Sequence, residues 1–224
     1  VLLLVALGGC FSERSGIINL GLEGIMVAGA LGGALVMKYM SYLSTAPMVI
    51  CVILGSVLFG MLFSLLLAVA AINFNADQTL VGTAMNMLAT AAATVFVKAI
   101  NMAENPNNVA STIQYISQKK AFSIVKIAGF EINWFMIITI VLLIAANVVL
   151  YRTRLGLRLM ACGEHPQAAD SVGINVYKMR YIGVLISGFL GGLGGIVYIT
   201  AGVSEWKFEN GVAGFGFLAL AVMI

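Results

Sequence analysis

The feature of this sequence that most restricts its fold is a series of apolar runs, each about as long as a membrane-spanning helix. Residues 78–97, 132–151 and 181–204 contain no Asp, Glu, Lys or Arg. A helix needs about 20 predominantly apolar residues to cross the hydrocarbon core of a bilayer. Only 9% of the chain is charged and 61% is hydrophobic, whereas a soluble domain is about 25% charged. We therefore expect the chain to be embedded in lipid.

The distribution of these runs predicts an all-α, polytopic transmembrane helical bundle. Helices satisfy their own backbone groups in lipid, and the runs lack the alternation of a membrane β-barrel. Two terminal runs, 1–11 and 211–224, have the composition of partial spans. We therefore expect a single transmembrane domain over residues 1–224, truncated at both ends. The five complete spans are expected at 17–37, 48–71, 78–97, 132–151 and 181–204.

The charges between the spans predict the orientation of the chain. Segment 152–180 contains five Lys or Arg residues against two Asp or Glu residues. Loops rich in Lys and Arg stay on the cytoplasmic side, so 152–180 is expected to be a cytoplasmic loop. Segments 103–132 and 203–210 are then expected outside. Three lysines within 103–132 argue against this orientation, but the arginine density of 152–180 outweighs them.

The stretch FSERSGIINLGLEGIMVAGA, residues 11–30, places polar side chains inside an otherwise apolar run. Asn19 and Glu23 are four residues apart and share one face of a helix. Polar and ionisable groups at membrane depth are expensive and commonly face a cavity or a partner. One interpretation is a broken or half-inserted helix beside a transport path. The alternative is an interfacial collar in which Glu23 pairs with Arg14, and the residues by themselves favour neither.

A second polar stripe lies in the run DQTLVGTAMNMLATAAATVF, residues 77–96. One interpretation is a polar wall of a substrate path, and the other is hydrogen bonding between helices. Packing alone is slightly favoured, and the two uses are compatible. The stripe consists of Thr79, Thr83, Asn86, Thr90 and Thr94, at helical spacing. From the two polar motifs together we predict Asn19, Glu23, Thr83 and Asn86 as substrate-pathway residues.

Small residues recur at intervals of four in two of the predicted spans. Gly188 and Gly192 form one such pair, and Gly191 and Gly195 form another. Pairs of this kind let helix backbones approach closely in membranes. We interpret them, together with Gly24, Ala28 and Gly32, as packing devices without chemistry.

The loop 152–180 contains a predicted short helix. Pro166 is suited to the first turn of a helix, and Gly173 is suited to its end. One interpretation is that this loop is a solvated connector without a specific role, and the composition favours it. The alternative is a helix that docks on a cytoplasmic partner. The residues predicted to take part in such docking are Gly163, Glu164, Pro166, Ala168, Ala169, Asp170 and Gly173.

Several kinds of chemistry find no support in the sequence. A GxxxxGK[ST] phosphate-binding loop is missing, and the three cysteines form no CxxC pair. The lone histidine, His165, rules out HExxH and makes a Ser–His site improbable. The net charge of +3 does not suggest a nucleic-acid partner. We therefore predict no catalytic residue and no metal site.

Four blocks of the sequence together resemble one family of transport proteins. FSERSGIINLGLEGIM at 11–26, ADQTLVGTAMNMLA at 76–89, LGLRLMACGEHPQAADSVGINV at 155–176 and GFGFLALAVMI at 214–224 occur in this order. They resemble the permeases of ABC importers for branched-chain amino acids, simple sugars and nucleosides. SERSGIINLGLEG and GEHPQAAD are most similar to the shorter permease of bacterial nucleoside importers, whereas sugar permeases typically have a GIDLS-like sequence in place of GIINLGLEG.

The resemblance implies a fold of about ten helices in the full subunit, in a bacterial cell membrane. It implies three partners: a second related permease, cytoplasmic ABC ATPases and an extracytoplasmic substrate-binding lipoprotein. ATP would be hydrolysed on the ATPase, so the chain itself would be a transport subunit without a cofactor, and 155–176 would couple it to the ATPase. The expected cargo is a nucleoside or another small polar solute. Branched-chain amino acids or simple sugars, an ATP-independent carrier or channel, and an assembly subunit without a path remain as alternatives.

Overall fold

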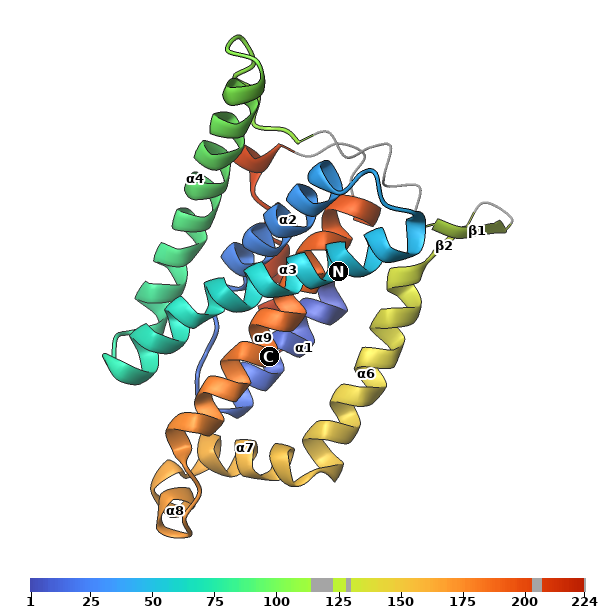
Figure 1. Cartoon of the computed structure of the whole chain (residues 1–224). Helices are drawn as coiled ribbons and strands as arrows, with labels where there is room; N and C mark the ends of the chain where they lie inside the picture. Colours follow the sequence, from blue (N-terminus) through green and yellow to red (C-terminus); the bar gives the residue numbers. More distant parts are fainter. Residues whose placement is uncertain (114–122, 128–129, 203–206, 224) are drawn as a thin grey trace.

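This computed structural model describes residues 1–113, 123–127, 130–202 and 207–223, which form nine α-helices and one short hairpin (Figure 1). Five helices are long and apolar enough to cross a membrane, which confirms the predicted bundle. The α-helices are α1 (Leu2–Arg14), α2 (Leu22–Tyr39), α3 (Thr45–Ala68), α4 (Gln78–Glu104), α6 (Trp134–Arg152), α7 (Arg154–Glu164), α8 (Pro166–Ser171), α9 (Val176–Val197) and α10 (Phe215–Met223). The π-helical turns η1 (Val69–Asn73) and η3 (Tyr198–Gly202) extend α3 and α9, and η4 (Phe208–Asn210) is a 3₁₀ turn.

Two elements differ from the sequence-based expectation of spans joined by loops. Strands β1 (Ser123–Ile127) and β2 (Phe130–Asn133) pair antiparallel within the segment 103–132, with Lys126 opposite Glu131. The loop 152–180 contains two helices, α7 and α8, where one was predicted. Both additions lie between the spans, where water or the interface supplies partners that lipid cannot. Residues 114–122 and 128–129 of the first segment lie outside the described part.

Helix α9 forms the centre of the bundle and contacts α1, α2 and α3. Its glycines make these contacts close, as the small-residue pairs predicted. A Cβ atom on Gly192 would lie only 2.6 Å from the Ser56 carbonyl oxygen of α3. The Ser56 Oγ donates a hydrogen bond of 2.7 Å to the Gly192 carbonyl oxygen. Any larger residue at Gly192 would therefore push α3 and α9 apart and break this bond.

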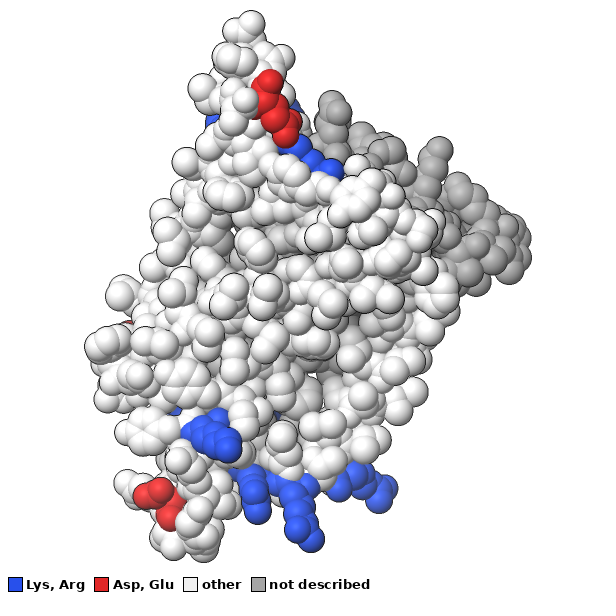
Figure 2. Space-filling view, in the orientation of Figure 1, with Lys and Arg blue, Asp and Glu red and all other residues white. Residues whose placement is uncertain are grey.

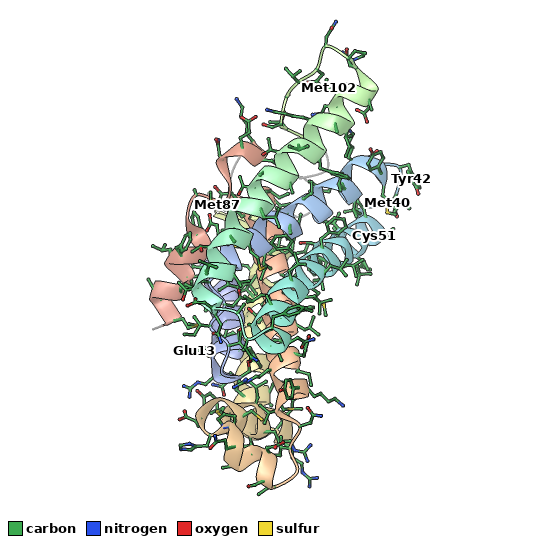
Figure 3. The ribbon with its side chains drawn as sticks, turned by 90° about the vertical axis from the view of Figure 1, so that its left-hand side faces the viewer. Glu13, Met40, Tyr42, Cys51, Met87 and Met102 are labelled. Atoms are coloured by element: carbon green, nitrogen blue, oxygen red, sulfur yellow. The ribbon has the colours of Figure 1, made fainter. Side chains whose placement is uncertain are left out.

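The two ends of the bundle differ in charge. Helix α6 stands to one side, and α7 crosses one end of the bundle from α6 towards α9, with α8 beyond it (Figure 1). Figure 2 shows that Lys and Arg side chains gather at this end, which we call the basic end, with a largely uncharged zone above it. Glu13 lies towards the basic end, whereas Met40, Tyr42 and Met102 lie towards the opposite end (Figure 3).

Polar side chains cap the N-termini of α4 and α9. The Asp77 carboxylate accepts the backbone N–H groups of Thr79 and Leu80, at 2.8 and 3.1 Å, at the start of α4. The N–H of Leu80, followed by that of Thr79, lowers the pKa of Asp77. Asn175 caps α9 by accepting the N–H of Lys178 at 2.9 Å. These caps satisfy backbone donors that have no partner within the helix.

The predicted orientation can be tested on described residues at the two ends. Ser171, the last residue of α8, and Asn107, after α4, are both exposed and are suited to single cysteine substitutions. In a background with Cys10, Cys51 and Cys162 replaced by alanine, a membrane-impermeant thiol reagent should label position 107 in intact cells. Position 171 should react only after the cells are opened, because the arginine-rich end is predicted to face the cytoplasm. The opposite labelling pattern would reverse the orientation.

Candidate functional site

The polar stretch after α1 forms a break between two helices. Helix α1 ends at Arg14 and α2 begins at Leu22, and residues 15–21 between them are not helical. Gly16 has φ of 86°, a left-handed conformation that glycine adopts without steric cost. The structure therefore has a non-helical segment where one of the two interpretations of this motif placed a broken or half-inserted helix. The span expected at 17–37 starts at Leu22 because the break extends to Gly21.

Side chains supply the hydrogen bonds that the break removes from the backbone. The Ser12 Oγ donates to the Ile17 carbonyl oxygen over 2.7 Å. The N–H of Ile18 donates to Gln78 Oε1 at the start of α4, also over 2.7 Å. Backbone polar groups without a partner are costly in an apolar surrounding. The non-helical conformation depends on these side chains.

Asn19 joins the break to the central helix α9. Its Nδ2 donates to the Ser187 Oγ over 2.8 Å, and its Oδ1 accepts the N–H of Gly21 over 3.1 Å. The side chain is almost fully buried, at 1% exposure. Both of its polar atoms are therefore engaged within the chain, and its role in a substrate path stays a prediction.

Asn86 joins α4 to the start of α2. Its Oδ1 accepts the N–H of Gly24 over 2.8 Å, and its Nδ2 donates to the Leu20 carbonyl oxygen over 2.9 Å. These are the bonds between helices that the packing interpretation of the polar stripe predicts. The threonines behave differently: the hydroxyls of Thr83 and Thr90 bond to carbonyl oxygens of α4 itself.

Glu23, in the first turn of α2, binds the start of α10. Its Oε1 accepts the N–H of Gly214 over 2.8 Å, and its Oε2 accepts the N–H of Gly216 over 2.7 Å. A carboxylate at a helix N-terminus satisfies free backbone donors and is favoured by the helix dipole. The alternative pair between Glu23 and Arg14 is not formed among the described residues.

A shallow, wide-open groove of about 570 Å³ lies along one face of α4 next to this contact, lined by side chains of α4 and by Glu209. Met87, about halfway along the helix, lies on it (Figure 3). A Cβ atom on Gly211 would lie 3.7 Å from Thr90 Oγ1 and 3.9 Å from Glu23 Oε1, so the groove and the Glu23 contact are adjacent. The lining residues are Asn86, Met87, Thr90, Ala91, Thr94, Val95 and Glu209. Thr83 is exposed on α4 but does not line the groove.

An ion pair closes one side of the groove. Lys98 Nζ of α4 lies 2.6 Å from Glu209 Oε1 of η4. The hydrogen bond from Lys98 and its positive charge lower the pKa of the Glu209 carboxyl. The groove thus combines hydroxyl and amide groups with a carboxylate and apolar side chains. This mixture suits a small solute that has both hydrogen-bonding edges and an apolar face.

Helices α7 and α8 bring the predicted docking residues together at the basic end. Helix α8 starts at Pro166, as predicted. At its other end the N–H of Gly173 bonds to the Asp170 carbonyl oxygen and the N–H of Ile174 bonds to that of Ala169, at 2.9 and 3.1 Å. This is the Schellman pattern, and Gly173 has the required left-handed φ, 82°.

The docking residues differ in what they offer a partner. Glu164, Ala168, Asp170 and Gly173 are exposed, whereas Ala169 is buried at 3% exposure. Gly163 packs against the end of α1, where an added Cβ would lie 2.5 Å from the Arg14 carbonyl oxygen. Of the two adjacent alanines, Ala168 is the one available for contact, and the docking role of the group stays a prediction.

Sequence reasoning missed four components of this region. Gln78, Ser187, Lys98 and Glu209 each bind a residue at least 60 positions away or on another element. Ser187 is a single polar residue in an apolar run, which is the only signal it carries, and Gln78 lies among the polar residues Asp77 and Thr79 at the start of a span. Lys98 and Glu209 give no local signal, because pairing between distant segments is decided by the tertiary structure.

Replacing Glu23 by Gln should destabilise the contact with α10. Gln keeps the shape of the side chain but has one acceptor oxygen, so one of the two N–H groups loses its partner. A hydrogen bond to a charged group contributes about 1.5–3 kcal/mol. Glu23→Gln should therefore lower the thermal midpoint in detergent and speed hydrogen exchange at Gly214 and Gly216. Glu13→Gln, at an exposed position of α1, is the matched control, and equal behaviour of the two variants would contradict the assignment.

The comparisons with known proteins agree with this architecture. The chain is 40% identical to the guanosine ABC transporter permease protein NupQ of Bacillus subtilis, over 100% of this chain and 70% of the relative. It is 39% identical to the nucleoside ABC transporter permease protein NupC of Lactococcus lactis, over 100% and 71%. The second nucleoside permease protein of that organism, NupB, is 24% identical over 100% and 63%. No solved structure matches the chain.

The match to a protein family extends over the same length. Residues 1–224 match the family described as branched-chain amino acid transport system / permease component. The five spanning helices place the chain in the cell membrane as a multi-pass protein. The chain therefore belongs to this family of ABC transporter permeases, the non-catalytic membrane subunits of their transporters.

Proposed function

We propose that this chain is the permease subunit of an ATP-driven bacterial importer for nucleosides. The observation that carries this proposal is the 40% identity to a guanosine permease over the whole chain. The 39% identity to a nucleoside permease of a second organism supports the same cargo. The family description names branched-chain amino acids, but the two relatives with about 40% identity are both named for nucleosides.

The proposal includes partners that the chain requires. ATP is hydrolysed on a cytoplasmic ABC ATPase, and an extracytoplasmic binding protein delivers the solute. Lactococcus lactis has two nucleoside permease proteins, and this chain is 39% identical to one and 24% to the other. This difference supports a second, distinct permease as the partner in the membrane.

The groove on α4 is the proposed wall of the substrate path. Thr90 and Thr94 present hydroxyls there beside the apolar side chains of Met87 and Val95. A nucleoside has a planar base with an apolar face and a ribose with several hydroxyls, so it matches both kinds of surface. Asn19, Glu23 and Asn86 fix the positions of the break and of α10 next to this wall. Thr83 lies on the exposed face of α4.

Reconstituted transport tests both the cargo and the path. Proteoliposomes with the complete transporter should take up guanosine only with ATP and the binding protein, and leucine or ribose should not compete. Thr90→Val and Thr94→Val should raise KM about 3- to 10-fold, because each removes a hydrogen bond that contributes about 0.5–1.5 kcal/mol. Thr139→Val on α6, which also removes a hydroxyl bonded to its own helix, should leave KM unchanged. Uptake without ATP, or of leucine in place of guanosine, would overturn the proposal.

The helix pair α7–α8 is the proposed contact with the ATPase. It forms the basic end of the bundle and projects beyond the spanning helices (Figure 1). Glu164, Ala168 and Asp170 are exposed there, and the Schellman turn at Gly173 holds α8 in place. A rigid element of this kind can move with a partner and transmit the motion to α9.

Three substitutions separate a docking element from a simple connector. Gly173→Val should abolish ATP-driven uptake and weaken recovery of the ATPase, because a β-branched residue is strained at positive φ. Gly173→Asn should behave close to the parent, since Asn tolerates this conformation. Ala168→Glu should also weaken ATPase recovery, whereas an exposed connector would tolerate it within about 0.5 kcal/mol. Normal uptake and ATPase recovery in all three variants would leave the connector interpretation standing.

A further inference from the structure

A second groove, of about 460 Å³, lies between α1 and α6 and takes no part in the proposed path. Its floor contains the buried residues Ala146 and Leu150 of α6. Leu7 and Cys10 form the wall on α1, and Asn147 and Tyr151 of α6 complete it. The groove is apolar apart from these last two side chains. It opens on a surface of spanning helices, where hydrocarbon is the surrounding medium.

The groove ends next to a cluster of arginines. Tyr151 lines it, and the next residues, Arg152, Arg154 and Arg158, are all exposed. Within the described part of the chain, none of the three forms an ion pair. Figure 2 shows Lys and Arg side chains gathered at this end of the molecule. Apolar surface at membrane depth is thus continuous with unpaired positive charge at the interface.

We propose that this groove binds an anionic phospholipid of the leaflet at the basic end. One acyl chain lies against Leu7, Cys10 and Ala146, and the phosphate headgroup lies at Arg152 and Arg154. Basic pockets between spanning helices bind anionic lipid headgroups, and this attraction adds to burial of the chain. Tyr151 sits where aromatic side chains prefer the membrane interface, and Asn147 offers a hydrogen-bond donor to the ester region.

The dimensions of the groove favour a lipid chain over another helix. An α-helix with side chains is about 10 Å wide and rises about 5.4 Å per turn. The volume of about 460 Å³ therefore corresponds to about one helical turn. An extended acyl chain is narrower than a helix, so the same volume accommodates a longer stretch of it. A lipid in the groove would also fill the space beside α6, whose main contacts with other helices in the described part of the chain are with α1 and α7.

Native mass spectrometry of the assembled transporter tests the headgroup contact. Membranes that contain phosphatidylglycerol and phosphatidylcholine should yield a complex that retains one phosphatidylglycerol per copy of this chain, with about tenfold preference, equal to about 1.4 kcal/mol. The double variant Arg152→Gln, Arg154→Gln should lose this preference. The matched control Lys178→Gln, Lys207→Gln removes two exposed positive charges on other elements, neither of which lines the groove, and should keep it. Equal retention of both lipids by the parent, or an unchanged preference in the first double variant, would overturn the proposal.

A second pair of variants tests the acyl-chain contact at membrane depth. Cys10→Trp fills the groove on α1 and should release the bound phosphatidylglycerol. Cys51→Trp places the same side chain on α3, outside the groove, and should retain the lipid. If a protein segment occupied the groove, Cys10→Trp would impair assembly without changing the amount of lipid per assembled complex, and the proposal would be wrong. Inorganic phosphate added in excess should not displace the lipid, because it lacks the chain that fills the groove.

Discussion

The contact between Glu23 and the start of α10 supports the part of the bundle on which the site depends. Both carboxylate oxygens accept backbone N–H groups, from Gly214 and Gly216. The backbone N–H groups in the first turn of a helix have no partner within the helix, and among apolar neighbours water cannot bind them. The Glu23 carboxylate removes this energetic cost for α10 by accepting two N–H groups at its start. The close approach leaves no room for a larger residue, since a Cβ on Gly216 would lie 2.6 Å from the Glu23 Cα. Charge and close packing therefore act together at this point.

The same requirement explains the other polar residues of the interrupted helix. Ser12, Asn19 and Asn86 each bond to a backbone group of residues 17–24. These side chains do not have to contact a solute. By fixing the backbone of the break, they also fix the position of α4 and of the groove on its surface. Polar residues in a membrane helix can thus serve transport through the backbone that they position. The proposed path and the packing network meet at α4, where Asn86 belongs to both.

Sequence reasoning located the spans but gave only part of the site. The break was one of two interpretations of the motif, because Asn19 and Glu23 interrupt an apolar run and lipid makes such interruptions costly. Helix α7 was not predicted, although its buried residues Gly156, Leu159 and Cys162 recur at intervals of three. Its arginines and glycines resembled a solvated loop. The partner of Glu23 was also not predicted, because Gly214 and Gly216 lie more than 190 residues away in the sequence.

The sequence alone determined that the chain is a helical membrane protein with a basic loop between two of its spans. These properties follow from local composition, because lipid excludes charge and demands that each segment satisfy its own backbone. Only the tertiary structure decided which polar groups face a groove and which form hydrogen bonds within the helix bundle. It paired Asn19 with the Ser187 hydroxyl and the Gly21 N–H, paired Glu23 with the start of α10, and left Thr90 and Thr94 on the groove. The physical reason is that hydrogen bonds between distant segments depend on how helices cross, and glycine contacts such as that between Gly192 and Ser56 set those crossings.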